Sequence, residues 1–193
     1  MAWYNPFSKK PVEEKLNPAQ QYMGNETAGS REPVFSYEKY YEELEIVNRG
    51  VNMLVDDVAA IPTLVQGEYK NPGIVKGVKR AKVENLLNYE PNPYQDISTF
   101  RRNLITDYLL DGNIFIYFDG AFIYHIPAGA MEIVPDSKNY IKEFIYDGTI
   151  KFKPEEIIHI KDNSFESIYW GTPRLKSALA DVGIIDKMQK LQD

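Results

Sequence analysis

Cysteine is absent from the 193 residues, and histidine occurs only twice, at His125 and His159. Without cysteine the chain has no disulfide, no thiol nucleophile and no cysteine-ligated zinc or iron–sulfur site. With two histidines a multi-histidine metal centre is not expected either. Long apolar runs are also missing, since the densest, Ile114–Phe118, has five residues, whereas a membrane-spanning helix needs roughly 18. We therefore expect no membrane partner and no metal or other cofactor.

Positive charge is in short supply as well. Lys and Arg number 22 against 28 for Asp and Glu, so the net charge is −6. Because affinity for phosphate comes mainly from excess Lys and Arg, this composition argues against a general nucleic-acid-binding protein. The remaining balance, 44% hydrophobic and 26% charged residues, is that of an ordinary globular protein with one or two domains.

Proline and glycine divide the chain into an N-terminal arm and an α+β domain. Residues 1–33 contain four prolines and few apolar residues after Phe7, which predicts a flexible arm before a domain over 34–193. A long helix is predicted from Ser36 to Ile61, because apolar residues recur every three or four positions until Pro62. Its other face is acidic. The apolar stripe consists of Tyr37, Tyr40, Tyr41, Leu44, Val47, Val51, Leu54, Val55, Val58 and Ile61.

A basic segment, Tyr69–Val83, follows the acidic helix and contains no acidic residue. Two functional interpretations are open, contact with nucleic acid and contact with the acidic face of a neighbouring subunit. A solvated loop is the third. The candidate contact residues are Lys76, Lys79, Arg80 and Lys82.

Short helices and β-hairpins are predicted in the rest of the chain. One helix covers Ala81–Asn88, and another runs from about Ser98 to Asp111-Gly112-Asn113, where glycine supplies the positive φ of a helix end. Two Asp-Gly dipeptides fit the type I′ turn and predict two hairpins. The hairpin strands are Ile114–Phe118 with Phe122–Ile126, and Tyr140–Tyr146 with Thr149–Lys153.

A strand and a helix are predicted at the C-terminal end. The strand is Ile157–Ile160, and the helix begins with Thr172 as N-cap and Pro173 at its first position, where proline's missing N–H would be unpaired anyway. The helix runs to Asp193 without a stop signal. We therefore expect the chain to be a piece of a longer protein, cut within a helix.

Catalytic motifs are not found. The GxxxxGK[ST] and GxGxxG phosphate loops and the Gly-x-Ser-x-Gly elbow do not occur. Asp136, in a strand-rich segment, is faintly similar to the metal-binding carboxylate of a nuclease, but no acidic-x-Lys unit follows it. His159 alternates with apolar residues and is interpreted as a structural histidine. A metal-dependent hydrolase or nuclease is therefore kept as the second hypothesis. The first hypothesis, given below, is a protein that is not an enzyme.

Three stretches carry a recognisable order of motifs. In the first stretch, a helix turn of small and apolar residues runs into a proline. In the second, paired leucines precede a Pro-Asn dipeptide, which is followed by a helix that has an early Phe and ends in Leu-Leu-x-Gly-Asn. In the third, a strand that contains a histidine precedes Gly-Thr-Pro. This order resembles the portal proteins of tailed bacteriophages, of the long-tailed type with lambdoid-like heads. Gly-Thr-Pro stands for the more usual Gly-x-Ser-Pro, and Ile114 replaces a small residue. The residues that match are Pro62, Pro91, Asn92, Phe100, Gly112, Asn113, His159, Gly171 and Pro173.

The resemblance implies a structural subunit without chemistry of its own. It implies a dodecameric ring at one capsid vertex of the virion, assembled in the host cytoplasm, through which double-stranded DNA passes without sequence specificity during packaging and ejection. The implied partners are further copies of the chain, the major capsid protein, the terminase and head-completion or tail proteins. The matched residues would form the wing, with stem and clip beyond Asp193. A non-ring head–tail adaptor is the third hypothesis.

The charge pattern adds a narrower prediction. We expect the acidic helix, residues 36–61, to contact the basic segment of an adjacent subunit, because the two have opposite charge.

Overall fold

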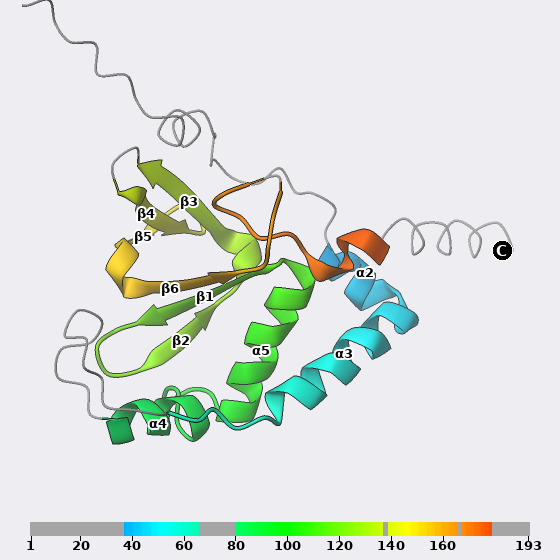
Figure 1. Cartoon of the computed structure of the whole chain (residues 1–193), viewed down its shortest axis with the longest axis horizontal. Helices are drawn as coiled ribbons and strands as arrows, with labels where there is room; N and C mark the ends of the chain where they lie inside the picture. The colour runs from blue at the N-terminus through cyan, green and yellow to red at the C-terminus, as the bar shows by residue number, and fades with distance from the viewer. Residues whose placement is uncertain (1–36, 66–79, 137–138, 166, 179–193) are drawn as a thin grey trace, which may run out of the picture.

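The computed structural model describes residues 37–65, 80–136, 139–165 and 167–178. The predicted α+β class is confirmed, because helices pack beside antiparallel sheets (Figure 1). The arm predicted over residues 1–33 lies outside the described residues, as does most of the basic segment.

The single long helix predicted from Ser36 to Ile61 is wrong, since the structure has two helices there. Helix α2 covers Tyr37–Glu43 and α3 covers Glu45–Ala59. Between them Leu44 is extended, with φ −107° and ψ 112°. The side-chain amide of Asn48 donates to the carbonyl of Tyr41 at 3.2 Å, so a side chain satisfies a backbone acceptor at the end of α2.

The inner face of α3 is narrower than the predicted apolar stripe. Val47, Val51 and Val55 are buried against the C-terminal part of α5, Ile97–Leu110. Their spacing of four keeps all three on one line along the helix. The predicted burial of Leu54, Val58 and Ile61 is wrong, because these residues are 52%, 48% and 62% exposed.

Helix α4 covers Arg80–Asn88, and it and α5 confirm the two shorter predicted helices. Asp96 is the N-cap of α5, and its side chain accepts from the backbone N–H of Thr99 at 2.9 Å. The helix ends at Leu110, and Gly112, two residues later, has a φ of +78°, the left-handed conformation that the sequence predicted there.

Within the described ranges six strands form two antiparallel sheets of three strands each, in the orders β2-β1-β6 and β3-β4-β5. Strand β3, with the separate sheet that it opens, was missed in the sequence. Three short 3₁₀ turns, η1 to η3, complete the described elements. Their bounds are β1 Asn113–Phe118, β2 Ile123–Ile126, β3 Met131–Asp136, β4 Tyr140–Tyr146, β5 Ile150–Phe152, β6 Ile157–Lys161, η1 Ala128–Ala130, η2 Pro154–Glu156 and η3 Arg174–Ala178.

The two Asp-Gly turns differ. Asp147 and Gly148 both have positive φ, 49° and 64°, as the predicted type I′ turn requires. The two-residue turn predicted at Asp119 is wrong, because Phe118 pairs with Ile123 and leaves four residues in the loop. The Asp119 carboxylate accepts from the N–H groups of Ala121 and Phe122, both at 2.7 Å, and this holds the longer loop.

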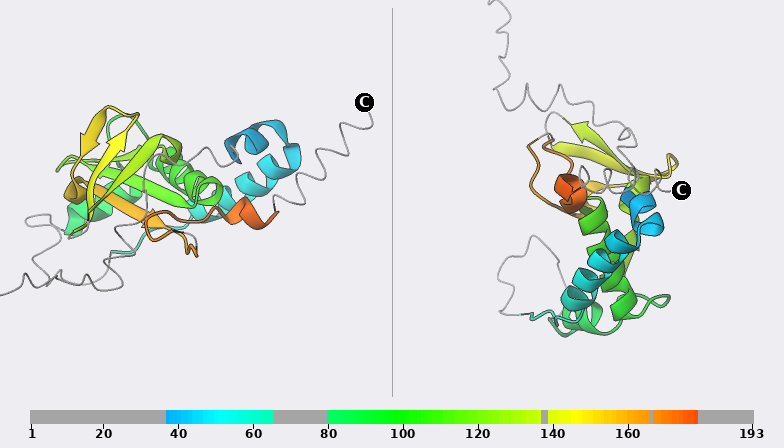
Figure 2. Two further views of the ribbon diagram at one scale, coloured as in Figure 1. Left: turned by 90° about the horizontal axis from the view of Figure 1, so that it is seen from above. Right: turned by 90° about the vertical axis from the view of Figure 1, so that its right-hand side faces the viewer.

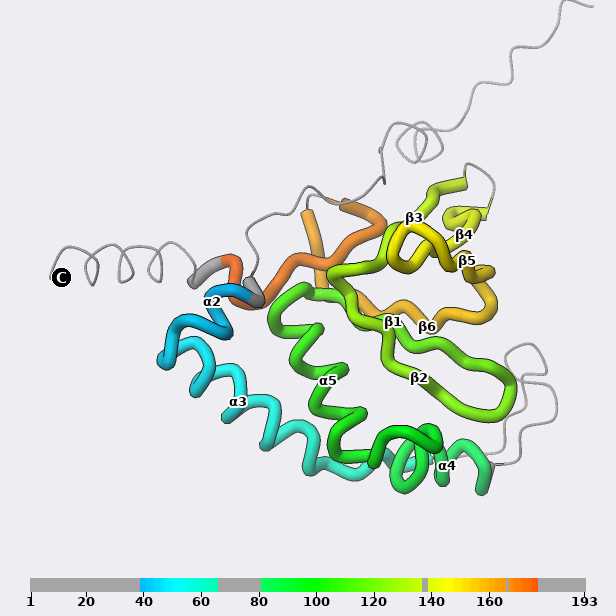
Figure 3. Tube along the Cα trace, turned by 180° about the vertical axis from the view of Figure 1, so that it is seen from behind, coloured from blue at the N-terminus to red at the C-terminus, as the bar shows by residue number. Residues whose placement is uncertain are grey.

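Strand β1 is the centre of the fold because both of its faces are covered. Phe115 points into the core between the two sheets, where Phe144 and Trp170 meet it. Ile116 points the other way, into the cluster that Leu86 of α4 and Phe100 of α5 form. Figure 3 shows α5 between α3 and the β1–β2 pair, and Figure 2 shows α2 and α3 at the opposite end from the β3-β4-β5 sheet.

Where the sequence predicted the start of the C-terminal helix, the described residues form the 3₁₀ turn η3, Arg174–Ala178. The rest of that predicted helix, from residue 179 onward, lies outside the described part of the chain.

Candidate functional site

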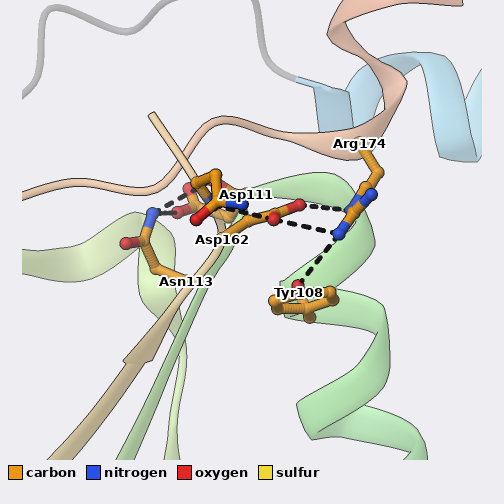
Figure 4. Close-up of polar contacts among 6 residues, drawn as sticks. Tyr108, Asp111, Asn113, Asp162 and Arg174 are labelled. Atoms are coloured by element: carbon orange, nitrogen blue, oxygen red, sulfur yellow. Dashed lines mark hydrogen bonds and ion pairs between the residues drawn. The ribbon is translucent and has the colours of Figure 1, made fainter. Parts of the chain in front are cut away.

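Most of the singled-out motif residues lie at the two ends of α5. At its C-terminal end the helix, β6 and the segment before η3 meet in one polar junction, which we call the α5–β6 junction (Figure 4). The junction residues are Tyr108, Asp111, Gly112, Asn113, His159, Asp162, Gly171 and Arg174.

Two glycines allow backbones to touch at this junction. The carbonyl of Gly112 accepts from the N–H of Asp162 at 2.9 Å. A Cβ atom added at Gly112 would stand 2.5 Å from the Thr172 carbonyl carbon, and one at Gly171 would meet the Gly112 carbonyl oxygen and lie 2.7 Å from the Asp162 nitrogen. Only a residue without a side chain therefore fits at either position.

Asn113 connects three segments and is fully buried. Its amide nitrogen donates to the backbone carbonyl and the carboxylate of Asp111, at 3.1 and 2.8 Å. Its amide oxygen accepts from the Gly171 N–H at 2.8 Å and lies 3.1 Å from Nε2 of His159. The Asp111 bonds fix which end of the amide is the acceptor, so Nε2 of His159 carries a proton.

His159 is held by stacking as well as by this hydrogen bond. Its ring stacks on Phe115 with centroids 4.4 Å apart and an interplanar angle of 11°, and the edge of Phe144 meets it at 6.0 Å. These neighbours are the core of the sheet pair, and the geometry suits a structural histidine.

Arg174 attaches the start of the C-terminal segment to the junction. Its guanidinium forms an ion pair with the carboxylate of Asp162 and donates to the hydroxyl of Tyr108 at 3.3 Å (Figure 4). The hydrogen bond to Tyr108, followed by the charge of Asp162, raises the pKa of Arg174. The guanidinium of arginine presents two N–H donors in a fork that matches the two oxygens of a carboxylate. The Arg174–Asp162 pair therefore fixes the relative orientation of the two side chains as well as pairing their charges.

At the N-terminal end of α5, Arg101 forms a set of hydrogen bonds that the sequence did not predict. Arg101 donates to the carbonyls of Ala59 and Ile61 at 3.2 and 2.9 Å, and to the carbonyl of Leu87 and Oδ1 of Asn88 at 2.6 and 2.7 Å. These acceptors lie at or after the ends of α3 and α4, where helix carbonyls lack backbone partners. One cation therefore ties three helices together.

The Pro-Asn motif lies in the turn before α5. The side chain of Asn92 donates to the carbonyl of Ile123 at 2.9 Å and accepts from the N–H of Tyr94 at 3.0 Å. The N–H of Ile123 in turn donates to the carbonyl of Pro91 at 2.9 Å. Asn92 and Phe100 are both 2% exposed. The motif thus anchors the turn to strand β2.

The remaining candidate residues do not gather at one place. Pro62 is exposed, three residues after α3 ends, and Pro173 is buried beside the glycine contact. Lys76 and Lys79 lie outside the described residues, and the side chain of Arg80 is not described either. Lys82 donates to the carbonyl of Gly120 at 3.3 Å within its own chain.

A histidine–carboxylate contact in the last turn of α5 was also missed. Nε2 of His125 lies 2.7 Å from Oδ2 of Asp107, which also accepts from the Ala128 N–H at 3.0 Å. The residues around His125 do not indicate Asp107 as its partner, because Asp107 lies 18 positions away in the chain.

Asp136 is the carboxylate on which the hydrolase hypothesis rests. Asp136 accepts from the side chain of Asn139 at 2.9 Å. Within the described ranges no three His, Asp or Glu residues are placed to hold a metal ion. The helices of the described ranges all lack the length and apolar composition that a membrane-spanning helix requires.

Comparison with known proteins gives the family. The family model described as phage portal protein matches residues 45–193. The portal protein of Escherichia phage T5 is 38% identical over 187 residues, which cover 94% of this chain and 45% of the relative, so the chain spans about half the length of that relative.

Solved structures show the same fold. A chain in the neck of an empty GTA particle, computed with C6 symmetry, matches with a TM-score of 0.67 at 18% identity, covering 82% of this chain and 45% of the other. One in the neck of the native particle, computed with C12 symmetry, matches with a TM-score of 0.67 at 19% identity, covering 85% and 44%. Order of motifs, fold and family model agree, and the chain belongs to the phage portal protein family.

Proposed function

We propose that this chain is the wing-like part of a structural subunit that assembles into a closed ring of copies at one capsid vertex of a phage particle. The observation that carries the proposal is the family match over residues 45–193. The likeness to a neck structure computed with twelve-fold symmetry supports the ring. The subunit performs no chemistry, and its partners are the capsid protein, the terminase and head-completion or tail proteins.

The hydrogen bonds at the two ends of α5 suit a subunit that must stay rigid while DNA passes through the ring. Arg101 fixes one end of the helix to the ends of α3 and α4, and Asn113 fixes the other end to β6 and to Gly171. Polar side chains in such positions are fully hydrogen-bonded, which rigidifies the fold. A subunit through which DNA is threaded benefits from that rigidity.

Passage of double-stranded DNA is proposed to be free of sequence-specific contacts. The net charge of −6 limits the release of counterions that holds DNA on basic surfaces. DNA would then slide past the ring during packaging and ejection instead of binding to it.

We further propose that the basic segment of one subunit faces the acidic helices α2 and α3 of the next. Between Tyr37 and Ala59 six acidic residues stand against Lys39 and Arg49. A contact between two different surfaces of identical subunits is heterologous, and such contacts close into rings when the rotation permits.

Native mass spectrometry and negative-stain electron microscopy of the full-length protein test the proposal. A closed assembly with a fixed subunit count is expected. Monomers or dimers of folded protein would contradict the ring and favour a non-ring adaptor. Metal-dependent cleavage of DNA that Asp136→Ala abolishes would instead support the nuclease hypothesis.

A further inference from the structure

The contacts on the two sides of Pro173 are closed off from solvent to different degrees. On the N-terminal side, the buried Gly171 donates its N–H to the fully buried Asn113 at 2.8 Å. The Gly112 carbonyl occupies the place that a Cβ atom of Gly171 would take. We call this contact of Gly112, Asn113 and Gly171 the inner contact. Pro173 is itself buried, so the chain is enclosed up to this residue.

On the C-terminal side, the chain is held by groups that solvent reaches. The side chain of Arg174 is 58% exposed and pairs with the carboxylate of Asp162, whose side chain is 9% exposed. The same guanidinium donates to the hydroxyl of Tyr108 at 3.3 Å. We call this contact of Tyr108, Asp162 and Arg174 the outer contact. Next to it, Leu175 is partly buried against the cluster between α3 and α5.

These differences indicate that η3 separates from α5 more readily than the inner contact opens. A 3₁₀ turn has poorer hydrogen-bond geometry than an α-helix, and η3 has five residues, with the Lys176 N–H donating to the Pro173 carbonyl at 3.1 Å. Elements with few buried apolar side chains and solvent-exposed hydrogen bonds open locally at a low cost in free energy. The inner contact cannot open in that way, because its backbones touch and Asn113 belongs to strand β1.

The ion pair of the outer contact favours the closed arrangement of η3. When η3 moves away from α5, Arg174 reaches solvent, but the carboxylate of Asp162 stays nearly enclosed. A carboxylate in such a place is destabilised by the loss of its cation. The pair therefore acts as a latch, whose strength depends on both charges and falls as salt screens them.

From these observations we propose that η3 is a hinged element, which opens away from α5 while the inner contact stays closed. The hinge lies at the step from Pro173 to Arg174, and the Arg174–Asp162 pair is the latch. The direction in which the chain leaves the domain then differs between a closed and an open state, and the latch sets the ratio of the two states. The proposal concerns movement within one subunit, so its failure would leave the ring proposal standing.

Hydrogen exchange of the full-length protein, read by mass spectrometry with fragmentation to single amides, tests the proposal. The Lys176 N–H, bonded to Pro173, reports on η3, and the Gly171 N–H, bonded to Asn113, reports on the inner contact. Asp162→Asn removes the negative charge of the latch while the shape of the side chain is nearly unchanged. The Lys176 amide should then exchange several-fold faster, while the Gly171 amide keeps its rate.

Arg102→Gln is the matched control, since it removes an ion pair with Asp56 elsewhere on α5 and should change the rate of neither amide. Combining Asp162→Asn with Arg174→Gln should add nothing to the larger of the two single effects, because the two residues share one contact. In the unchanged protein, added salt should speed exchange of the Lys176 amide and leave that of the inner contact as it was. Equal acceleration of both amides, an unchanged rate at Lys176, or additive effects of the two changes would each overturn the proposal.

Discussion

The backbone N–H of Gly171 donates to the side-chain oxygen of Asn113 at 2.8 Å, across 58 positions of the sequence. This bond joins the end of α5 to the segment that leads into η3. It forms only because Gly112 and Gly171 let two backbones approach without side chains between them. The Gly-Asn and Gly-Thr-Pro motifs, distant in the sequence, are thus two halves of one contact.

Gly171→Ala should destabilise the protein by about 2–3 kcal/mol, because its methyl group would strike the Gly112 carbonyl and overpack a backbone contact. The free energy of unfolding in urea measures the loss. Gly120→Ala is the control, since Gly120 has φ +95° but open space around its Cβ position, so only backbone strain of about 1 kcal/mol is expected. Equal losses would show that the contact does not matter.

Arg101 and Arg102 are neighbours of the same type with different expected effects. Arg101→Ala removes the donor for carbonyls at the ends of two helices and should lower the free energy of unfolding by about 2–4 kcal/mol. Arg102→Ala removes an ion pair with Asp56 whose two side chains are 42% and 56% exposed, so a loss of about 0–1 kcal/mol is expected. Chemical denaturation of both variants measures the two losses. A larger loss for Arg102→Ala than for Arg101→Ala would contradict the stabilising role of the Arg101 hydrogen bonds.

Asp96 should make stability depend on acid pH. Hydrogen bonds from the backbone and hydroxyl of Thr99 lower its pKa below the ordinary 3.8. Because the folded pKa is the lower one, this contribution is present above pH 3.8 and is lost as pH falls through the folded value. Asp96→Ala should therefore lower the Tm at pH 7. The difference in Tm between this variant and the unchanged protein should shrink as the pH falls below 3.8.

Asp96→Asn separates the charge from the cap. Asparagine keeps a side-chain acceptor for the Thr99 N–H but does not titrate, and it caps helices about as well as aspartate. Its melting temperature should stay close to that of the unchanged protein near pH 7. A pH profile of Asp96→Ala that runs parallel to the unchanged protein down to acid pH would argue against this interpretation.

Local features of the fold were predictable because their causes are local. Gly112 turns the chain just after α5, and Asp147-Gly148 turns a hairpin, since each conformation depends on residues that follow one another. The break at Leu44 was not predictable from the apolar pattern. It depends on Asn48, whose side chain competes for the carbonyl of Tyr41, and amphipathic spacing carries no information about that competition.

The contacts at the two ends of α5 were out of reach for a different reason. Asn113 and Gly171 were singled out as motif residues, but nothing in the sequence stated that they bond to one another. Arg101 carried no signal at all, because its acceptors are backbone carbonyls, which every residue possesses. Partners of that kind are specified by topology alone.

The proposed contact between subunits leads to a last prediction. Changing Lys79, Arg80 and Lys82 together to glutamate should impair ring assembly, most strongly at low salt, because exposed charges are screened within roughly 10 Å at 0.1 M salt. Lys82→Glu alone is the control, since Lys82 bonds to Gly120 within its own chain and lies beside Asp119. Native mass spectrometry across a salt series measures the assembled fraction. If the single and triple variants assemble equally poorly, the defect lies in the β1–β2 loop of the subunit, and the basic segment has no part in the interface.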